Sequence, residues 1–235
     1  MERRGFVTFC AASAAAAAAP ASFSSLGADS QPRLYTRARL VDGTGSPLYG
    51  KSVPRERNLI FHYPYASTPC FLLNLGRPAP GAAQLRTANQ QVYEWRGGVG
   101  AGRSIVAYSA ICAHRLTYPT KDISFISYRA EKSARNRFGS VIHCCSEHSQ
   151  YDPAEGARVL AGPAPQPLAA ILLEHDAATD ELYAVGTLGG EMFNEFFDKF
   201  AFKLQLEHGA AARAAAGNAC TVLPLEDYCR QQVKC

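Results

Sequence analysis

The amino-acid sequence predicts an all-β domain with added segments at both ends. Short runs of four to eight residues, rich in β-branched and aromatic side chains, recur along the chain between glycine and proline residues. The length of 235 residues, with 47% hydrophobic and 19% charged residues, suits one folded domain with appendages. No internal repeat is present, so a repeat architecture is excluded.

The N-terminal segment, residues 1–28, is expected to be a twin-arginine export signal or a membrane anchor. Arg3 and Arg4 precede an alanine-rich run, as in twin-arginine signals. The run is only weakly apolar and Pro20 interrupts it, which makes it marginal as a membrane span of about 20 apolar residues. Small residues at 19–21 and 26–28 offer cleavage sites. A cleaved signal and a retained anchor both remain open.

Residues 29–57 are expected to be a connector, because glycine and proline recur at 43, 45 and 47. The main domain is predicted to span residues 58–190. Its expected strands are 58–65, 70–75, 92–95, 104–111, 158–161, 168–174 and 181–185. The glycine-rich residues 97–102 are expected to form a hairpin loop, because no Lys-Ser/Thr pair follows as a phosphate cradle requires.

Residues 191–235 are predicted to be a C-terminal extension. The phenylalanines between 193 and 200 fit one helical face, whereas Phe202, Leu204 and Leu206 alternate as in a strand, so both structures remain open. The extension ends with Cys220, Cys229 and Cys235, which are near enough in sequence for a local disulfide. Eight cysteines in the chain suit an oxidising compartment.

Two stretches carry metal-ligand chemistry: Cys112-Ala113-His114 and Cys145-Ser146-Glu147-His148. Two thiolates and two imidazoles can hold zinc tetrahedrally. They can also hold a [2Fe–2S] cluster in which two histidines replace two cysteines on one iron. The other four histidines (62, 143, 175 and 208) have no partner at ligand spacing and are expected to be structural or surface residues.

The residues after the second stretch favour the cluster. Ser149-Gln150-Tyr151-Asp152 comes directly after His148, and Gly162-Pro163-Ala164-Pro165 lies ten residues further on. With these stretches the sequence resembles the Rieske iron–sulfur subunits of quinol–cytochrome c oxidoreductases. The resemblance implies a small antiparallel β-sandwich with the cluster-binding loops at one tip.

The resemblance also implies a role for each residue. Cys112 and Cys145 are expected to bind the inner iron, and His114 and His148 the outer one. Ser149 and Tyr151 are expected to donate hydrogen bonds that tune the potential. Gly162, Pro163, Ala164 and Pro165 form the expected proline loop, which shields the cluster from water.

The sequence departs from the family in and around both stretches. Thr117 and Ser146 stand where the respiratory proteins carry two more cysteines, joined as a disulfide brace. No glycine separates His148 from Ser149. Cys144, one position before the expected ligand, could compete with it. The connection between the stretches is longer than usual, so an insertion at residues 121–139 is expected; a solvated basic loop is favoured there over a docking patch.

The function implied is one-electron transfer in a membrane-associated respiratory complex, from quinol toward a c-type cytochrome. Such a chain is an electron-transfer subunit beside membrane or catalytic subunits, rather than a self-sufficient enzyme. Its expected location is the periplasmic side of a bacterial inner membrane, anchored or peripheral. The alternatives are a subunit serving a periplasmic oxidoreductase and a structural zinc-binding protein. A net charge of +4 is too mild to indicate nucleic-acid binding.

Overall fold

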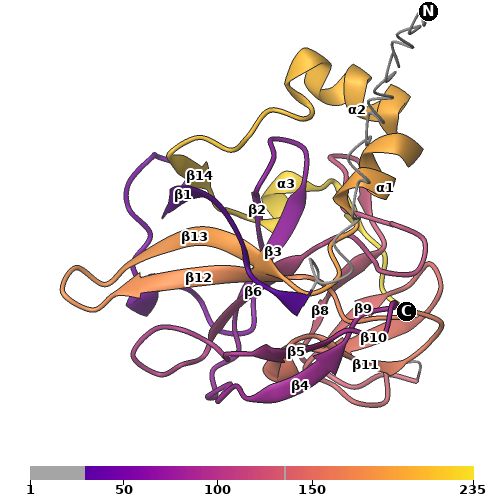
Figure 1. The fold of residues 1–235 in the computed structure, drawn as a ribbon, viewed down its shortest axis with the longest axis horizontal. Helices are drawn as coiled ribbons and strands as arrows, with labels where there is room; N and C mark the ends of the chain where they lie inside the picture. The colour runs from indigo at the N-terminus through magenta and orange to yellow at the C-terminus, as the bar shows by residue number, and fades with distance from the viewer. Residues whose placement is uncertain (1–29, 135) are drawn as a thin grey trace, which may run out of the picture.

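The computed structural model describes residues 30–134 and 136–235. The predicted signal or anchor at residues 1–28 lies outside them. Within the described part, no helix combines the length and the apolar character needed to cross a membrane. The predicted all-β class is confirmed, because two main sheets and two short two-stranded sheets make up the described chain, with only short helices (Figure 1).

The larger sheet has eight strands and carries the first ligand stretch at the end of β6. In spatial order its strands are β14 (Ala219–Thr221), β1 (Arg33–Val41), β13 (Glu181–Leu188), β12 (Ala170–Asp176), β6 (Ile105–Ser109), β3 (Pro69–Asn74), β2 (Leu59–His62) and β15 (Leu223–Pro224). All neighbours in this sheet pair antiparallel except β1 with β14.

One C-terminal segment pairs with both edges of this sheet. Its strand β14 pairs with β1, and its strand β15 pairs with β2 at the opposite end of the strand order. Only Val222 separates these two strands, and its amide donates to the carbonyl of Val41 at 2.8 Å. The edges at β1 and β2 are therefore brought together, and the sheet closes on itself.

The second ligand stretch lies in the smaller, four-stranded sheet. In spatial order its strands are β11 (Arg158–Ala161), β10 (Ser149–Asp152), β9 (Val141–Cys144) and β8 (Ile126–Arg129). The two-stranded sheets pair β16 (Gln231–Gln232) with β7 (Ile123–Ser124), and β4 (Ala83–Arg86) with β5 (Val92–Trp95). Residues 121–139, expected to be a solvated loop, thus contain β7 and β8.

The expected connector, residues 29–57, contains strand β1. Along this strand, Arg37 and Arg39 are exposed, whereas Ala38 and Leu40, each one residue further on, are buried. This alternation with a period of two is typical of a half-buried strand. The loop at residues 97–102 links β5 to β6 and is closed by a bridge between Val99 and Ile105. It is not the expected hairpin loop, because β5 pairs with β4 whereas β6 pairs with β3 and β12.

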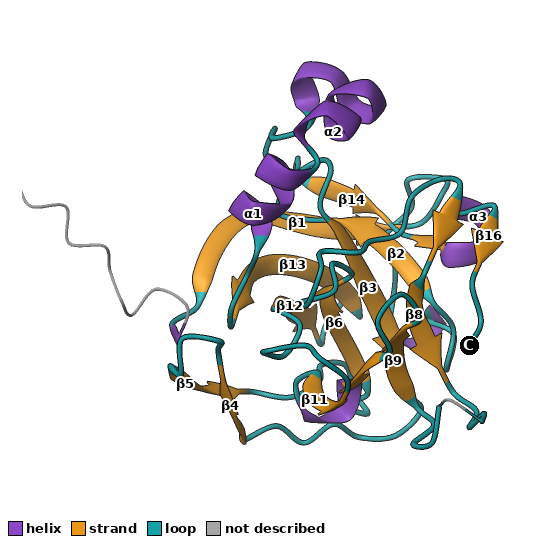
Figure 2. Cartoon of the chain, turned by 90° about the vertical axis from the view of Figure 1, so that its right-hand side faces the viewer, coloured by secondary structure: helices purple, strands orange, loops and turns teal. Residues whose placement is uncertain are grey.

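The C-terminal extension forms helices rather than a strand at the residues left open. They are α1 (Phe193–Lys199), α2 (Ala201–His208) and, further on, α3 (Leu225–Tyr228). On α1, Phe193, Phe196 and Phe197 are buried against Ile111 and Tyr118, which flank the first ligand stretch. Helices α1 and α2 lie next to each other at one end of the molecule (Figure 2). Packing by α1 therefore fixes the first stretch.

Candidate metal centre

The first ligand stretch is a tight turn at the end of β6. The amide of Cys112 donates to the carbonyl of Thr117 at 2.8 Å, and the amide of Leu116 donates to the carbonyl of Cys112 at 2.9 Å. These two bonds close residues 112–117 into a compact loop. Cys112 is 1% exposed, whereas His114 is half-buried toward the rim. The loop thus buries its thiol fully and its imidazole in part.

The second stretch is the turn of a hairpin between β9 and β10. Cys144 pairs with Ser149 across the hairpin, so residues 145–148 make the turn. His148 has φ +58°, the left-handed conformation that glycine adopts most easily. His148 therefore occupies the conformation that the missing glycine would have taken, and this explains how Ser149 can follow it directly.

Two buried thiols meet between the loops: Cys112 and Cys144. Their hydrogen bond, helped by the Tyr151 hydroxyl and opposed by burial, lowers the pKa of Cys112 to about 6. The same hydrogen bond, together with burial, raises the pKa of Cys144. Backbone amides also point at each sulfur. For each cysteine they are the amides of the residues two and three positions later in the chain. A pair of cysteine sulfurs held in this way is a ready ligand set for a soft metal centre.

Three further polar side chains belong to the first ligand stretch and to β10. The Tyr151 hydroxyl lies 3.3 Å from Cys112 Sγ and accepts a hydrogen bond from the amide of Ala113 at 3.2 Å. Within the described residues, two buried polar atoms at this site have no hydrogen-bond partner: His114 Nδ1 and Ser149 Oγ. Buried polar atoms are rarely left unpaired in folded proteins, so each is a candidate to contact a bound group.

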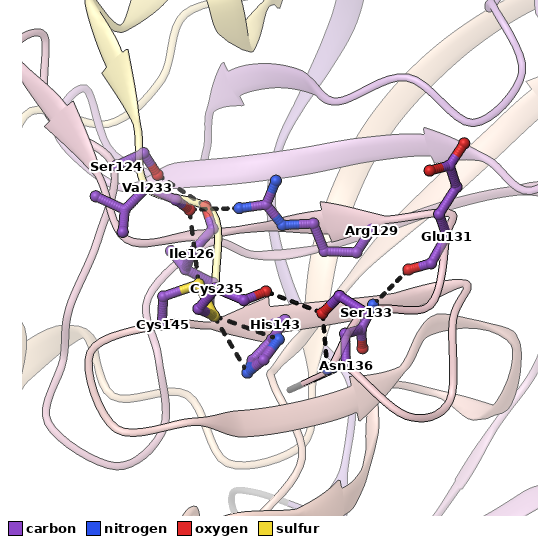
Figure 3. Close-up of a disulfide and its surroundings, with 10 residues drawn as sticks. All are labelled: Ser124, Ile126, Arg129, Glu131, Ser133, Asn136, His143, Cys145, Val233 and Cys235. Carbon is purple, nitrogen blue, oxygen red and sulfur yellow. Dashed lines mark hydrogen bonds between the residues drawn. A yellow bond between two sulfur atoms is a disulfide. The ribbon is translucent and has the colours of Figure 1, made fainter.

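Cys145, predicted as the second thiolate, does not join this pair in the structure. Its sulfur forms a disulfide with Cys235, 90 residues further along the chain (Figure 3). A disulfide sulfur is not a thiolate, so Cys145 cannot act as the predicted ligand while this bond exists. The sequence left open whether Cys220, Cys229 and Cys235 form a local disulfide; in the structure Cys220 and Cys229 are free thiols, and Cys235 is bonded to Cys145.

His148, predicted as the second imidazole, lies on the same side as that disulfide. Its ring centroid is 5.8 Å from that of His143. Ligand atoms of His143, His148 and Cys235 lie within 4.8 Å of one another, a grouping that sequence spacing alone could not reveal. Because the Cys235 sulfur is in the disulfide, this group offers a metal two imidazoles and no thiolate.

The residue before it, Glu147, contacts the first ligand loop instead. Its carboxylate Oε1 lies 3.5 Å from Nε of Arg115, the residue that follows His114. The second turn therefore presents Glu147 to the first loop and His148 to the C-terminal tail.

The predicted proline loop follows β11 and covers the second hairpin. Gly162 has φ +88°, and a side chain there would come within 2.5 Å of Ser149 Cα and 2.6 Å of the His148 carbonyl oxygen. Ala164 packs against the core that contains Cys112 and Cys144. The backbone of this loop thus lies directly against the second stretch.

No protein-family model matches the sequence. Among solved structures, the chain is similar to the soluble domain of the Rieske protein II (soxF) from Sulfolobus acidocaldarius. The identity is 25%, the match covers 67% of this chain and 82% of that chain, and the TM-score is 0.45. At this TM-score the likeness assigns neither ligands nor function to this chain.

Proposed function

We propose that the chain is a one-electron carrier that binds a Rieske-type [2Fe–2S] cluster between the two ligand loops. The observation that supports this most strongly is the meeting of the Cys112 and Cys144 sulfurs in the core, where the backbone amide of His114 points at the Cys112 sulfur. The unpartnered Nδ1 of His114 fits a bond to iron, and the unpartnered Oγ of Ser149 fits a hydrogen bond to a bridging sulfide. The donors present therefore suit mixed sulfur and nitrogen ligation.

Each side chain has a distinct part in this proposal. Cys112 and Cys144 would hold the buried iron and His114 the outer one, with a fourth donor from the second turn, where Glu147 and His148 are adjacent. When bound, the cluster accepts and releases a single electron. The Tyr151 hydroxyl stabilises negative charge on Cys112 Sγ, because it is a hydrogen-bond donor within reach of that sulfur.

Metal analysis and spectroscopy test the cluster directly. Purified protein should contain about two irons and two labile sulfides per chain and absorb visible light, as a [2Fe–2S] centre requires. After reduction, electron paramagnetic resonance should show the low average g-value that mixed nitrogen and sulfur ligation produces. One zinc per chain, with neither iron nor labile sulfide, would instead establish the alternative of a structural zinc protein.

We further propose that the carrier serves a respiratory complex, taking electrons from quinol and passing them toward a c-type cytochrome. The support is the sequence resemblance in the two stretches and the proline loop. Co-purification from native membranes tests it, because a quinol-oxidising complex and a periplasmic oxidoreductase would bring different catalytic subunits. Export is tested by replacing Arg3 and Arg4 with lysine, which should leave the protein in the cytoplasm.

A further inference from the structure

We infer that the second hairpin directs Cys144 and Glu147 toward the first ligand loop, as the donors that complete the cluster site. Cys145 and His148, which the sequence spacing favours, instead secure the C-terminal tail, residues 230–235. The inference rests on the proposed cluster, because without one none of these residues is a ligand.

The two cysteines point to opposite sides because they are neighbours at the end of a strand. Successive side chains on a β-strand alternate between its faces. Cys144, the last residue of β9, is fully buried in the core that holds Cys112. Cys145, one residue on, leaves that face and bonds to Cys235. Only one of the two sulfurs can therefore reach Cys112 from this hairpin.

The backbone supports Cys144 independently of the disulfide. The amides of His114 and Arg115, two and three residues after Cys112, point at its sulfur. The amides of Ser146 and Glu147, two and three residues after Cys144, point at that sulfur in the same way. Amide donors of this kind stabilise thiolate ligands of iron–sulfur clusters. Both loops thus form the same cradle, and in the second loop the cradle is built around Cys144.

Several hydrogen bonds besides the disulfide hold the tail in place near Cys145 (Figure 3). The amide of Val233 donates to the carbonyl of Ser124 at 2.9 Å, and the guanidinium of Arg129 donates to the carbonyl of Val233. The hydroxyl of Ser133 donates to the carbonyl of Cys235 at 3.1 Å. These bonds hold Cys235 beside the second hairpin, so the disulfide is one of several contacts that dock the tail there.

Glu147 is the fourth donor, because it is the residue of the second turn that contacts the first ligand loop. Glu147 faces Arg115 beside His114, whereas His148 is exposed on the side of His143 and Cys235. A carboxylate at this position brings one more negative charge than a neutral imidazole. The added charge opposes reduction, while Arg115 offsets part of it. The cluster should therefore bind one histidine nitrogen and have a lower potential than a centre with two imidazoles.

The loaded wild-type protein supplies the first test. Pulsed electron paramagnetic resonance on protein with ¹⁵N-labelled histidine should detect one coordinated nitrogen. Alkylation of free thiols, followed by peptide mapping without reductant, should find the Cys145 and Cys235 peptides joined. Two coordinated nitrogens, or an alkylated Cys145, would overturn the inference and leave the proposed cluster intact. Wild-type protein without iron would overturn the proposed function itself.

Matched variants supply the second test. Cys145→Ser and His148→Gln should each retain at least about 80% of the wild-type iron and the visible spectrum. Cys144→Ser and Glu147→Gln should each lose most of the iron. The reverse pattern, in which iron is lost with Cys145→Ser or His148→Gln, contradicts the inference. Because Cys144 is buried and its variant could fail to fold, the decisive comparison is retention of iron in Cys145→Ser and His148→Gln.

Discussion

Removing the Tyr151 hydroxyl tests how this chain tunes a bound cluster. The side chain is fully buried, and its hydroxyl lies 3.3 Å from Cys112 Sγ. Tyr151→Phe keeps the ring in the core and deletes only that donor. A hydrogen bond to a charged group contributes about 1.5–3 kcal/mol. Because the donor stabilises the added electron, its loss should make reduction less favourable by about that amount.

This energy converts directly into a potential. For one electron, about 1.4 kcal/mol corresponds to 59 mV, so Tyr151→Phe should lower the potential by roughly 60–130 mV. Protein-film voltammetry on wild type and variant measures the difference. Tyr63→Phe is the matched control, since its buried hydroxyl donates to the carbonyl of Thr36 at 3.2 Å, in a different part of the core. Equal potentials for Tyr151→Phe and wild type would refute the reasoning.

Three further outcomes are expected. Gly162→Ala should accelerate loss of the cluster in a time course of visible absorbance, because its side chain would collide with the backbone of Ser149; Gly217→Ala, with open space around it, should not. Cys235→Ser should lower the free energy of unfolding in urea by about 2–4 kcal/mol, because it opens a long covalent loop. Burial, reinforced by His208, lowers the pKa of His62 to about 4. Stability should therefore fall as the pH drops from about 6.5 toward 4, where the unfolded chain binds the proton first, and His62→Gln should flatten this dependence in unfolding experiments at each pH.

Much of the fold could be predicted because its strands are punctuated by glycine and proline. The runs near β2, β3, β5, β6, β12 and β13 all lie in strands of the structure. Strand β1 was missed although Ala38 and Leu40 alternate with arginines, because the turn residues that follow dominate that segment. Residues 193–206 could not be assigned from periodicity, since Phe202 and Leu206 are exposed on α2 and follow no buried face.

The site was predictable only in part, for a physical reason in the second stretch. Cys144 and Cys145 are adjacent, so sequence spacing alone permits either cysteine as the thiolate ligand. The family's Cys-x-x-His spacing then favours Cys145, because His148 lies three residues after it. The decision depends on Cys235, which is 90 residues away and contacts the hairpin only in the folded chain. The one local signal is the absent glycine before Ser149. If His148 takes the place of that glycine, the ligand positions before it move back by one residue, from Cys145 to Cys144.

The pairing of one late segment with both edges of the large sheet also has a consequence for how the chain folds. Strands β14 and β15 follow every other strand of that sheet in sequence. Until they pair, β1 and β2 present open rows of amide and carbonyl groups, which can pair with strands of another molecule. The period before residues 219–224 add to the sheet is therefore the interval of greatest aggregation risk, and their arrival ends it at both edges together.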